Sequence, residues 1–191
     1  LHLCDYNLEK ITDTNTTTTH NLLADVLLAA KYEGQSITQN HGKYQLNYPD
    51  SPSQLCTELA RSFADIGDII RGRDLYRRDN KKDKTDKLQE QLKKYFQKIY
   101  EELSRTRGKQ NGEVKRRYED NGGNYSKLRE DWWNANRLEV WKAITCGTHE
   151  GDTYFRPTCG SGNNASATYD KCQCANTDVP TNFDYVPQYL R

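Results

Sequence analysis

Six cysteines are the residues of this chain with the clearest chemistry. They are spread from near the first residue to near the last, at Cys4, Cys56, Cys146, Cys159, Cys172 and Cys174. An even set of cysteines spaced in this way is typical of a disulfide framework, and disulfides persist in oxidising compartments. The sequence does not choose among the possible pairings. Because alternate side chains of an extended segment point to opposite faces, we expect Cys172 and Cys174 to bond different partners.

The same residue types could instead bind zinc, through Cys146 and His149 together with Cys172 and Cys174. The gap between Cys172 and Cys174 is shorter than the usual spacing of paired zinc ligands. Such a site would also leave the other three cysteines without a role. We therefore predict that all six cysteines form disulfides, with no metal and no cofactor.

Catalytic patterns are missing from the sequence. There is no Gly-x-Ser-x-Gly nucleophile motif, and the glycine pairs at 122–123 and 160–162 lack the spacing and the lysine of a phosphate-binding loop. Four histidines fall in predicted termini, loops or a helix start, without a nucleophile motif nearby: His2, His20, His41 and His149. We predict that the protein is not an enzyme. A secreted enzyme is the alternative, and it would require a concave site with perturbed ionisable groups.

Positive charge is concentrated in one part of the chain. Residues 71–120 hold 17 Lys/Arg and 10 Asp/Glu, whereas the remainder holds 11 and 17. This asymmetry predicts an anionic partner, for which sulfated glycosaminoglycan is the natural extracellular choice. Nucleic acid is excluded because the compartment is wrong and no nucleic-acid-binding motif is present. The alternative is a solvated helical face with internal ion pairs. The candidate contacts are Arg71, Arg73, Arg77, Arg78, Lys81, Lys82, Lys84, Arg105, Arg107, Lys109, Lys115, Arg116 and Arg117.

Helical segments must position these residues. Apolar residues make up only 34% of the chain and charged residues 29%, so the core is thin and disulfides would help to stabilise it. Helix signals and apolar spacing predict four main helices, at His20–Glu33 (ended by Gly34), Ser51–Ile70, Thr85–Arg107 and Ser126–Ile144. The segments 35–50, 108–125 and 147–186 read as loops, with one short helix at Val114–Tyr118, and 71–86 reads as a loop or a fraying helix. The fold class is therefore all-α: a disulfide-stapled helix bundle with long irregular loops.

Three further features bear on packing and location. Trp132 follows the apolar stripe of its helix, and we expect Trp133 to pack on a second face rather than stand exposed as an anchor for a partner. Gly67 suits a close approach of two helices. The longest apolar run, 22–30, is interrupted by a charge and is shorter than the roughly 18 residues of a membrane span. The chain holds no methionine and begins with Leu1, so we read it as an internal piece of a longer polypeptide.

Several long motifs, in order along the chain, resemble one known family. They are Leu3-Cys4-Asp5-Tyr6-Asn7-Leu8-Glu9, the segment 59–76 from Leu59-Ala60-Arg61 to Asp74-Leu75-Tyr76, Arg129-Glu130-Asp131-Trp132-Trp133, Val140-Trp141-Lys142-Ala143-Ile144-Thr145-Cys146, and Val179-Pro180-Thr181-Asn182-Phe183-Asp184 continuing to Arg191. Together they are similar to the alpha-type Duffy-binding-like domain of the var-encoded erythrocyte membrane adhesins of malaria parasites.

That resemblance implies a fragment of one Duffy-binding-like domain, with residues 1–178 as the middle subdomain and 179–191 as the start of the following helical subdomain. It implies display on the outer face of the infected erythrocyte as part of a membrane-anchored protein, with no direct membrane insertion by this segment. The implied function is host-cell adhesion in cytoadhesion or rosetting by a variant, virulence-linked antigen. The four cysteines that follow residue 76 resemble the larger group of members, which is less tied to rosetting.

The resemblance also implies the partners. They are a host red-cell or endothelial receptor or glycan (heparan-type or blood-group sugars), host antibodies, and neighbouring domains of the same polypeptide. A second hypothesis is a structural spacer and antigenically variable decoy that has no ligand of its own. Binding of host cells by the domain separates the two hypotheses.

Overall fold

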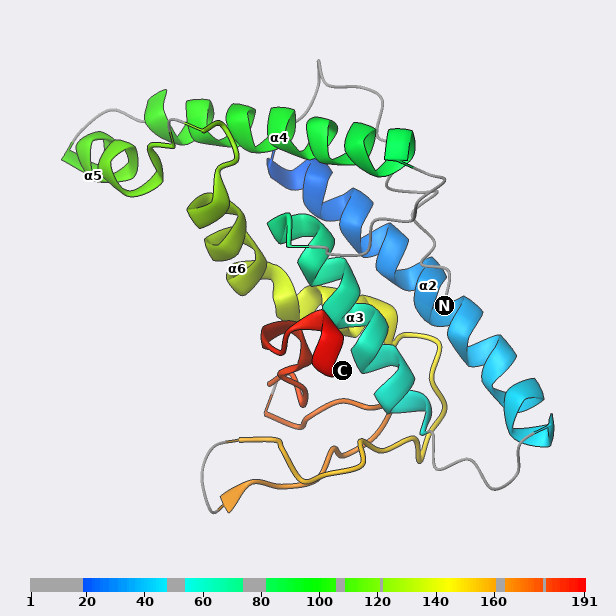
Figure 1. The fold of residues 1–191 in the computed structure, drawn as a ribbon. Helices are drawn as coiled ribbons and strands as arrows, with labels where there is room; N and C mark the ends of the chain where they lie inside the picture. The colour runs from blue at the N-terminus through cyan, green and yellow to red at the C-terminus, as the bar shows by residue number, and fades with distance from the viewer. Residues whose placement is uncertain are drawn as a thin grey trace. The chain divides into compact units, whose positions relative to one another are not determined.

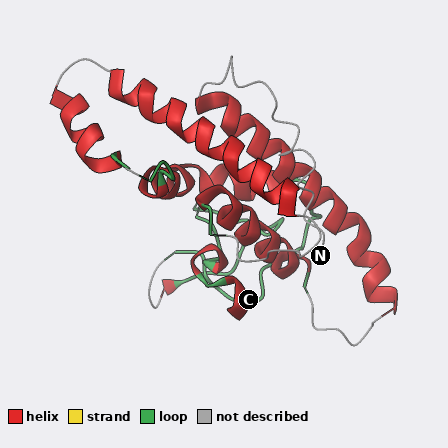
Figure 2. Cartoon of the chain, turned by 45° about the horizontal axis from the view of Figure 1, so that its top comes forward, coloured by secondary structure: helices red, strands yellow, loops and turns green. Residues whose placement is uncertain are grey.

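The computed structural model describes residues 19–47, 54–73, 82–105, 109–120, 122–160, 164–176 and 178–191. The elements within these ranges are the α-helices α2 (Thr19–Asn47), α3 (Leu55–Arg71), α4 (Lys82–Arg105), α5 (Lys109–Tyr118) and α6 (Ser126–Ile144), and the short 3-10 helices η2 (Phe183–Tyr185) and η3 (Gln188–Leu190) (Figure 1). The remaining described segments are loops, drawn green in Figure 2. The predicted all-α, disulfide-stapled fold is confirmed.

The chain forms two compact units. Of the described residues, the first unit holds those within Leu27–Gly67 and Arg137–Arg191, and the second holds those within 19–26 and Asp68–Asn136. The helices α2, α3 and α6 each contribute residues to both units. Within the described residues, no helix is both long enough and apolar enough to cross a membrane.

The predicted end of the first helix is wrong. α2 continues through Gly34 to Asn47, so residues 35–47 are helical rather than loop (Figure 1). Gly34 serves packing instead of termination. A β-carbon at this position would lie 1.8 Å from the carbonyl oxygen of Ile144, at the end of α6. A close approach of two helices is therefore found at Gly34, because only a residue without a side chain fits there. The close approach that we expected at Gly67 stays a prediction.

Most of the other helices lie close to their predicted positions. α6 begins at Ser126 as predicted, and α4 begins three residues before Thr85. α5 is longer than the short helix predicted at Val114–Tyr118. The predicted cap at Ser51 lies outside the described residues, which resume just before α3. The stripe of α3 that was read from apolar spacing, Leu55, Leu59, Phe63, Ile66 and Ile70, is buried.

In the first unit, a small apolar core joins α3 to α6. The rings of Phe63 and Trp141 meet edge to face with their centroids 5.3 Å apart, and both side chains are fully buried. The indole N–H of Trp141 donates to the carbonyl oxygen of Cys172 over 3.0 Å. The core of this unit is thereby tied to the long loop that follows α6.

That loop has almost no regular structure, as predicted for residues 147–186. Only two isolated β-bridges, Cys159 with Ser166 and Asp170 with Gln173, order it in the described part. Two disulfides hold it: Cys56–Cys172 ties it to α3, and Cys159–Cys174 closes it on itself. Cys172 and Cys174 bond different partners, and that expectation is confirmed.

The last segment of the chain docks on the first unit through charge. Arg137 donates from Nη2 to Asp184 at 2.8 Å and to the carbonyl oxygen of Thr181 at 2.9 Å. Arg191 reaches Asp65 of α3 at 2.9 Å. Asp184 is fully buried, so its carboxylate requires this cation.

In the second unit, α4 and α6 pack through aromatic side chains. Phe96 and Trp132 meet edge to face with centroids 6.0 Å apart. Trp133 has no exposed surface, and the guanidinium of Arg71 lies over its ring at 5.8 Å. The prediction that Trp133 packs inside the protein is confirmed.

A buried cation completes this core. Arg129 lies over the ring of Phe96 at 5.4 Å and donates to the side-chain oxygen of Gln89 at 2.9 Å. Burial lowers the pKa of Arg129 to about 10, so its side chain still carries a charge at neutral pH. Gly72, at φ 71°, makes room for it, since a β-carbon there would lie 2.5 Å from Nη1 of Arg129.

Candidate functional site

Four basic residues of α4 lie on one line along the helix: Lys87, Lys94, Lys98 and Arg105. At 3.6 residues per turn, their spacings of seven, four and seven residues keep them within about 20° of a common direction, over about 27 Å of helix. The apolar residues Leu88, Leu92 and Ile99 occupy the buried side. We call these four residues the α4 line.

Among the described residues, the lysines of the α4 line have no partner that neutralises their charge. Lys87 and Lys94 are exposed and Lys98 is partly exposed. Within the described part of the chain, none of the three makes an ion pair or a side-chain hydrogen bond. Arg105 is 79% exposed and lies 3.8 Å from Glu101, which is a loose surface pair. The line therefore offers positive charge to solvent along most of α4.

The three consecutive basic residues of α5 are used in two different ways. Val114 and Tyr118 are the partly buried residues of this helix. Arg117 is committed to Asp131 of α6, with its Nη2 at 2.7 Å and its Nε at 2.8 Å from Oδ2. Lys115 and Arg116 are exposed and have no such partner among the described residues. We call Lys115 and Arg116 the α5 pair.

Two other predicted contacts lie at the end of α3 and are paired with carboxylates. The side chain of Arg71 is 1% exposed and binds Asp68 at 3.0 Å and Glu130 at 3.4 Å. Arg73 is 58% exposed and binds the same Glu130 at 2.8 Å. A polyanion would have to displace buried carboxylates to reach Arg71, whereas the Arg73 side chain faces solvent.

The remaining predicted contacts cannot be placed. Arg77, Arg78, Lys81 and Arg107 lie outside the described residues. For Lys82, Lys84 and Lys109 the helix backbone is described and the side chains are not. The three lysines of the α4 line were absent from the prediction, which followed clusters along the sequence. Their helical spacing was the signal that would have found them.

The cysteines do not assemble a metal site. Cys172 and Cys174 are consumed in disulfides, so the zinc alternative is wrong. Cys146 is exposed and unbonded, which differs from the prediction for that residue, while Cys4 lies outside the described part. No cluster of metal-ligating side chains occurs among the residues that the structure describes.

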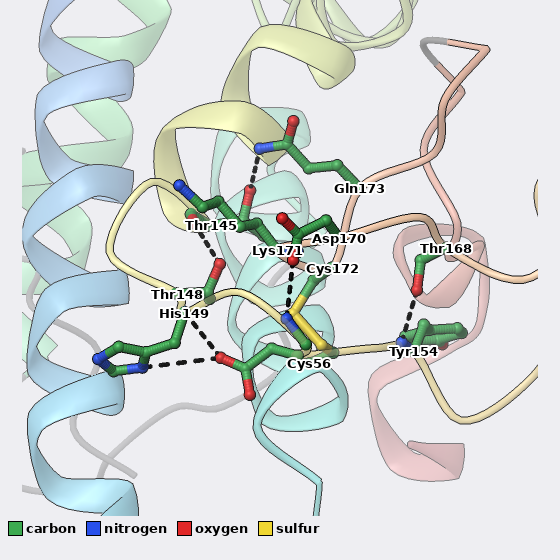
Figure 3. Close-up of a disulfide and its surroundings, with 12 residues drawn as sticks. Cys56, Thr145, Thr148, His149, Tyr154, Thr168, Asp170, Lys171, Cys172 and Gln173 are labelled. Atoms are coloured by element: carbon green, nitrogen blue, oxygen red, sulfur yellow. Dashed lines mark hydrogen bonds and ion pairs between the residues drawn. A yellow bond between two sulfur atoms is a disulfide. The ribbon is translucent and has the colours of Figure 1, made fainter.

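Hydrogen bonds around Cys56–Cys172 explain how this disulfide is supported (Figure 3). Lys171 and Cys172 form a tight turn with φ of 50° and 57°, a conformation that costs free energy for residues other than glycine. The backbone N–H of Cys172 donates to the carbonyl oxygen of Asp152 at 2.8 Å. Side-chain Nε2 of Gln173 donates to Thr145 at 3.0 Å. The residues around this disulfide thus have a structural role: their hydrogen bonds hold the loop after α6 in place.

The described histidine side chains each lie near a carboxylate. Nδ1 of His41 lies 3.1 Å from Glu58, which links α2 to α3. Nδ1 of His149 lies 3.8 Å from Asp152 in the loop after α6 (Figure 3). Each pairing joins a ring to a carboxylate and neither includes a nucleophile. The side chain of His20 and the whole of His2 lie outside the described part.

Comparison with known proteins finds a matching family model and similar solved structures. A family model described as the Duffy binding domain matches residues 1–191. No curated protein matches the chain. Among solved structures, the NTS-DBL1-alpha and CIDR-gamma double domain of PfEMP1 from the Plasmodium falciparum varO strain is 43% identical with a TM-score of 0.76. The NTS-DBL1(alpha-1) domain from the same strain is 42% identical with a TM-score of 0.75.

A third similar structure is the PfEMP1 IT4var13 DBLbeta domain, described as ICAM-1-binding, which is 34% identical with a TM-score of 0.68. The chain is covered at 99%, 99% and 100% in these three comparisons. It spans only 25%, 40% and 39% of the three solved chains, so it corresponds to a part of each.

Proposed function

The chain belongs to the Duffy binding domain family, and from that premise we propose that it is a non-catalytic adhesion module of a variant surface antigen. It acts on the outer face of the infected erythrocyte, as part of a membrane-anchored protein. Two disulfides in an otherwise thin-cored chain support an extracellular setting. The partner is a host receptor or a sulfated or blood-group glycan. Support for a host protein partner comes from the similar DBLbeta domain, whose structure was solved bound to ICAM-1.

We assign the polyanion contact to the α4 line and the α5 pair. The strongest support is that Lys87, Lys94 and Lys98 have no carboxylate partner in the described part, although acidic residues occur on the same helix. Cations that are already paired contribute little to a new partner, because the first pair must be broken. Exposed and unpaired cations act at once on an approaching anion.

A division of the chain at residue 178 accompanies this proposal. Residues 1–178 form the middle subdomain of a Duffy-binding-like domain, and 179–191 begin the next. The ion pairs Arg137–Asp184 and Arg191–Asp65 would then anchor the first residues of the following subdomain on the preceding one.

Heparin chromatography tests the polyanion contact. The decisive variant is K87E/K94E/K98E, and its matched control is K31E/K43E/K171E in the first unit. All three control lysines are exposed and unpaired in the described part, and both variants change the net charge equally. We expect the unsubstituted chain to elute above physiological salt, the α4 variant to elute clearly earlier, and the control to elute nearly unchanged. Equal shifts for the two variants would show only a net-charge effect and would remove the proposed contact.

Two further variants complete this test. K115E/R116E examines the α5 pair, and R77E/R78E examines the predicted contacts that lie outside the described residues. We expect the first to shift elution because its side chains face solvent. An unchanged elution for K115E/R116E would confine the contact to α4.

A binding screen separates adhesion from the spacer hypothesis. The complete domain, and its neighbours as separate proteins, are offered to red cells and endothelial cells. Adhesion predicts binding by this domain that soluble receptor or glycan abolishes. Binding by the neighbours alone would favour the spacer and antigenic decoy.

A further inference from the structure

One carboxylate holds α5 against α6. Oδ2 of Asp131, in the second turn of α6, accepts hydrogen bonds from Arg117 Nε at 2.8 Å and from the Tyr118 hydroxyl at 2.9 Å. The same oxygen lies 2.7 Å from Nη2 of Arg117. Three donors from two consecutive residues of α5 therefore converge on one atom. We call this group the Asp131 latch.

The described residues of α5 make few other contacts that hold the helix in place. It is ten residues long and contains Gly112, and helices of this length are marginal by themselves. Val114 and Tyr118 are its only partly buried side chains among those described. Its orientation therefore depends on a small apolar contact, on packing against α4, and on the latch.

The latch also divides the basic run of α5. Successive residues of a helix are turned by about 100°, so Arg116 lies almost opposite the inward side formed by Val114 and Tyr118. Arg117 lies on the flank that meets Asp131. When Arg117 is held, Lys115 and Arg116 are presented to solvent in one orientation. When it is released, all three cations move with a mobile helix and are less ordered toward a ligand.

We propose that Asp131 is a positioning residue for polyanion binding: by holding Arg117 and Tyr118 it orients α5, so that Lys115 and Arg116 are fixed for an anionic partner. This inference rests on the proposed function and goes beyond it, since it gives an acidic residue a favourable part in binding an anion. Arg117 then acts through its bond to Asp131 and is not itself a ligand contact.

The direction in which one substitution changes polyanion binding tests this proposal. D131N removes one negative charge beside the cations, and simple electrostatics predicts tighter binding of a polyanion. A positioning role predicts the opposite result. The matched control is E119Q, because Glu119 is exposed at the end of α5, makes no side-chain pair in the described part, and loses the same charge.

The experiment uses heparin elution and hydrogen exchange of the same proteins. We expect D131N to elute earlier than the unsubstituted chain and E119Q to elute slightly later. We expect the α5 amides to exchange about two to five times faster in D131N, the range that a partly exposed ion pair supports, and unchanged in E119Q. Y118F, which changes no charge, is expected to shift both readouts in the direction of D131N and by less.

Two results would overturn the inference. One is later elution of D131N, matching E119Q; the other is unchanged exchange of α5 in D131N. Failure of the proposed function would show itself differently, because the unsubstituted chain would then elute below physiological salt. That outcome would remove the binding part of the inference, while the exchange difference between D131N and E119Q would still decide whether the latch orders α5.

Discussion

Different kinds of contact stabilise the interior of each of the two units. All the described disulfides lie in the first unit, which contains the long loop after α6. In the second unit, the described stabilising contacts are aromatic packing, the buried cations Arg71 and Arg129, and the ion pair of the exposed Arg117 with Asp131. The two units belong to one polypeptide, and their described residues are stabilised in different ways.

The difference follows from how much regular structure each unit has. A helix satisfies its own backbone hydrogen bonds, so the second unit needs only side-chain contacts to hold its helices. The loop at 147–182 has two isolated bridges and few buried apolar side chains. The conformational entropy of such a segment must be reduced covalently, because packing alone does not offset it. The described disulfides therefore accompany the long loop of the first unit, which is also held by the ion pairs Arg137–Asp184 and Arg191–Asp65.

Removing the disulfides should give the largest effect. Cys56–Cys172 joins residues 116 apart and Cys159–Cys174 joins residues 15 apart. The chain-entropy model gives a loss of about 5 kcal/mol for a long loop of this kind and about 3 kcal/mol for the short one. We expect C56A/C172A to destabilise the first unit more than C159A/C174A, as measured by urea unfolding with hydrogen exchange resolved by segment. If C56A/C172A lost more amide protection in 86–103 of the second unit than in 164–176 of the first, the proposed difference between the units would be wrong.

A buried ion pair should give the next effect, this time in the second unit. R71A removes the cation that binds Asp68, leaves Glu130 with Arg73 alone of its two arginines, and removes the contact with Trp133. Loss of one partner from a buried pair costs about 3–5 kcal/mol. R73A is the matched control, since Arg73 binds the same Glu130 from an exposed position and should cost at most about 1 kcal/mol. Equal losses in the free energy of unfolding for R71A and R73A would mean that burial of the pair has no role.

Two glycines of α2 should respond with opposite signs. G34A places a methyl group against the carbonyl oxygen of Ile144, and overpacking of this kind costs about 1–3 kcal/mol or more. G42A has nothing within 4 Å of the new carbon and should stabilise the helix by about 0.5–1 kcal/mol. Thermal unfolding of both variants checks this. A stabilising G34A would contradict the close approach of α2 and α6.

The smallest effect concerns pH and the Asp131 latch. Burial alone would raise the pKa of Asp131, but hydrogen bonds from Arg117 and Tyr118 outweigh it and hold the pKa below its usual value. A carboxyl group whose pKa is lowered on folding stabilises the fold above its unfolded pKa of about 4, and this contribution is lost as pH falls through the folded value. We expect an NMR titration of the Asp131 carboxyl carbon to show a midpoint below that of a free aspartate. A midpoint at or above that of a free aspartate would show that the Asp131 latch does not stabilise the second unit.

Sequence reasoning predicted the helices well where the apolar spacing was strong. The stripe of α3 and the start of α6 needed only local rules, because a helix buries one face and begins at a recognisable cap. It failed at Gly34, since glycine ends a helix in one setting and admits a neighbouring backbone in another. The deciding neighbour, Ile144, lies far away in the sequence.

The sequence predicted that the candidate site is basic, but it predicted only some of the residues that form it. The spacing of Lys87, Lys94 and Lys98 was readable, because the period of a helix is known. The different fates of Lys115, Arg116 and Arg117 were not readable, since the three are adjacent and chemically alike. Only the folded chain brings Asp131 to one of them.

By itself, the sequence determined that this protein is helical, that the loop after residue 146 is rich in cysteine, and that positive charge is concentrated between residues 71 and 120. Those properties depend on local spacing and composition. The tertiary structure decided which cysteines pair, which glycine admits another helix, and which arginines are consumed inside the protein. Each of these is settled by contacts between residues distant in sequence, such as Arg71 with Glu130, and local patterns carry no information about them.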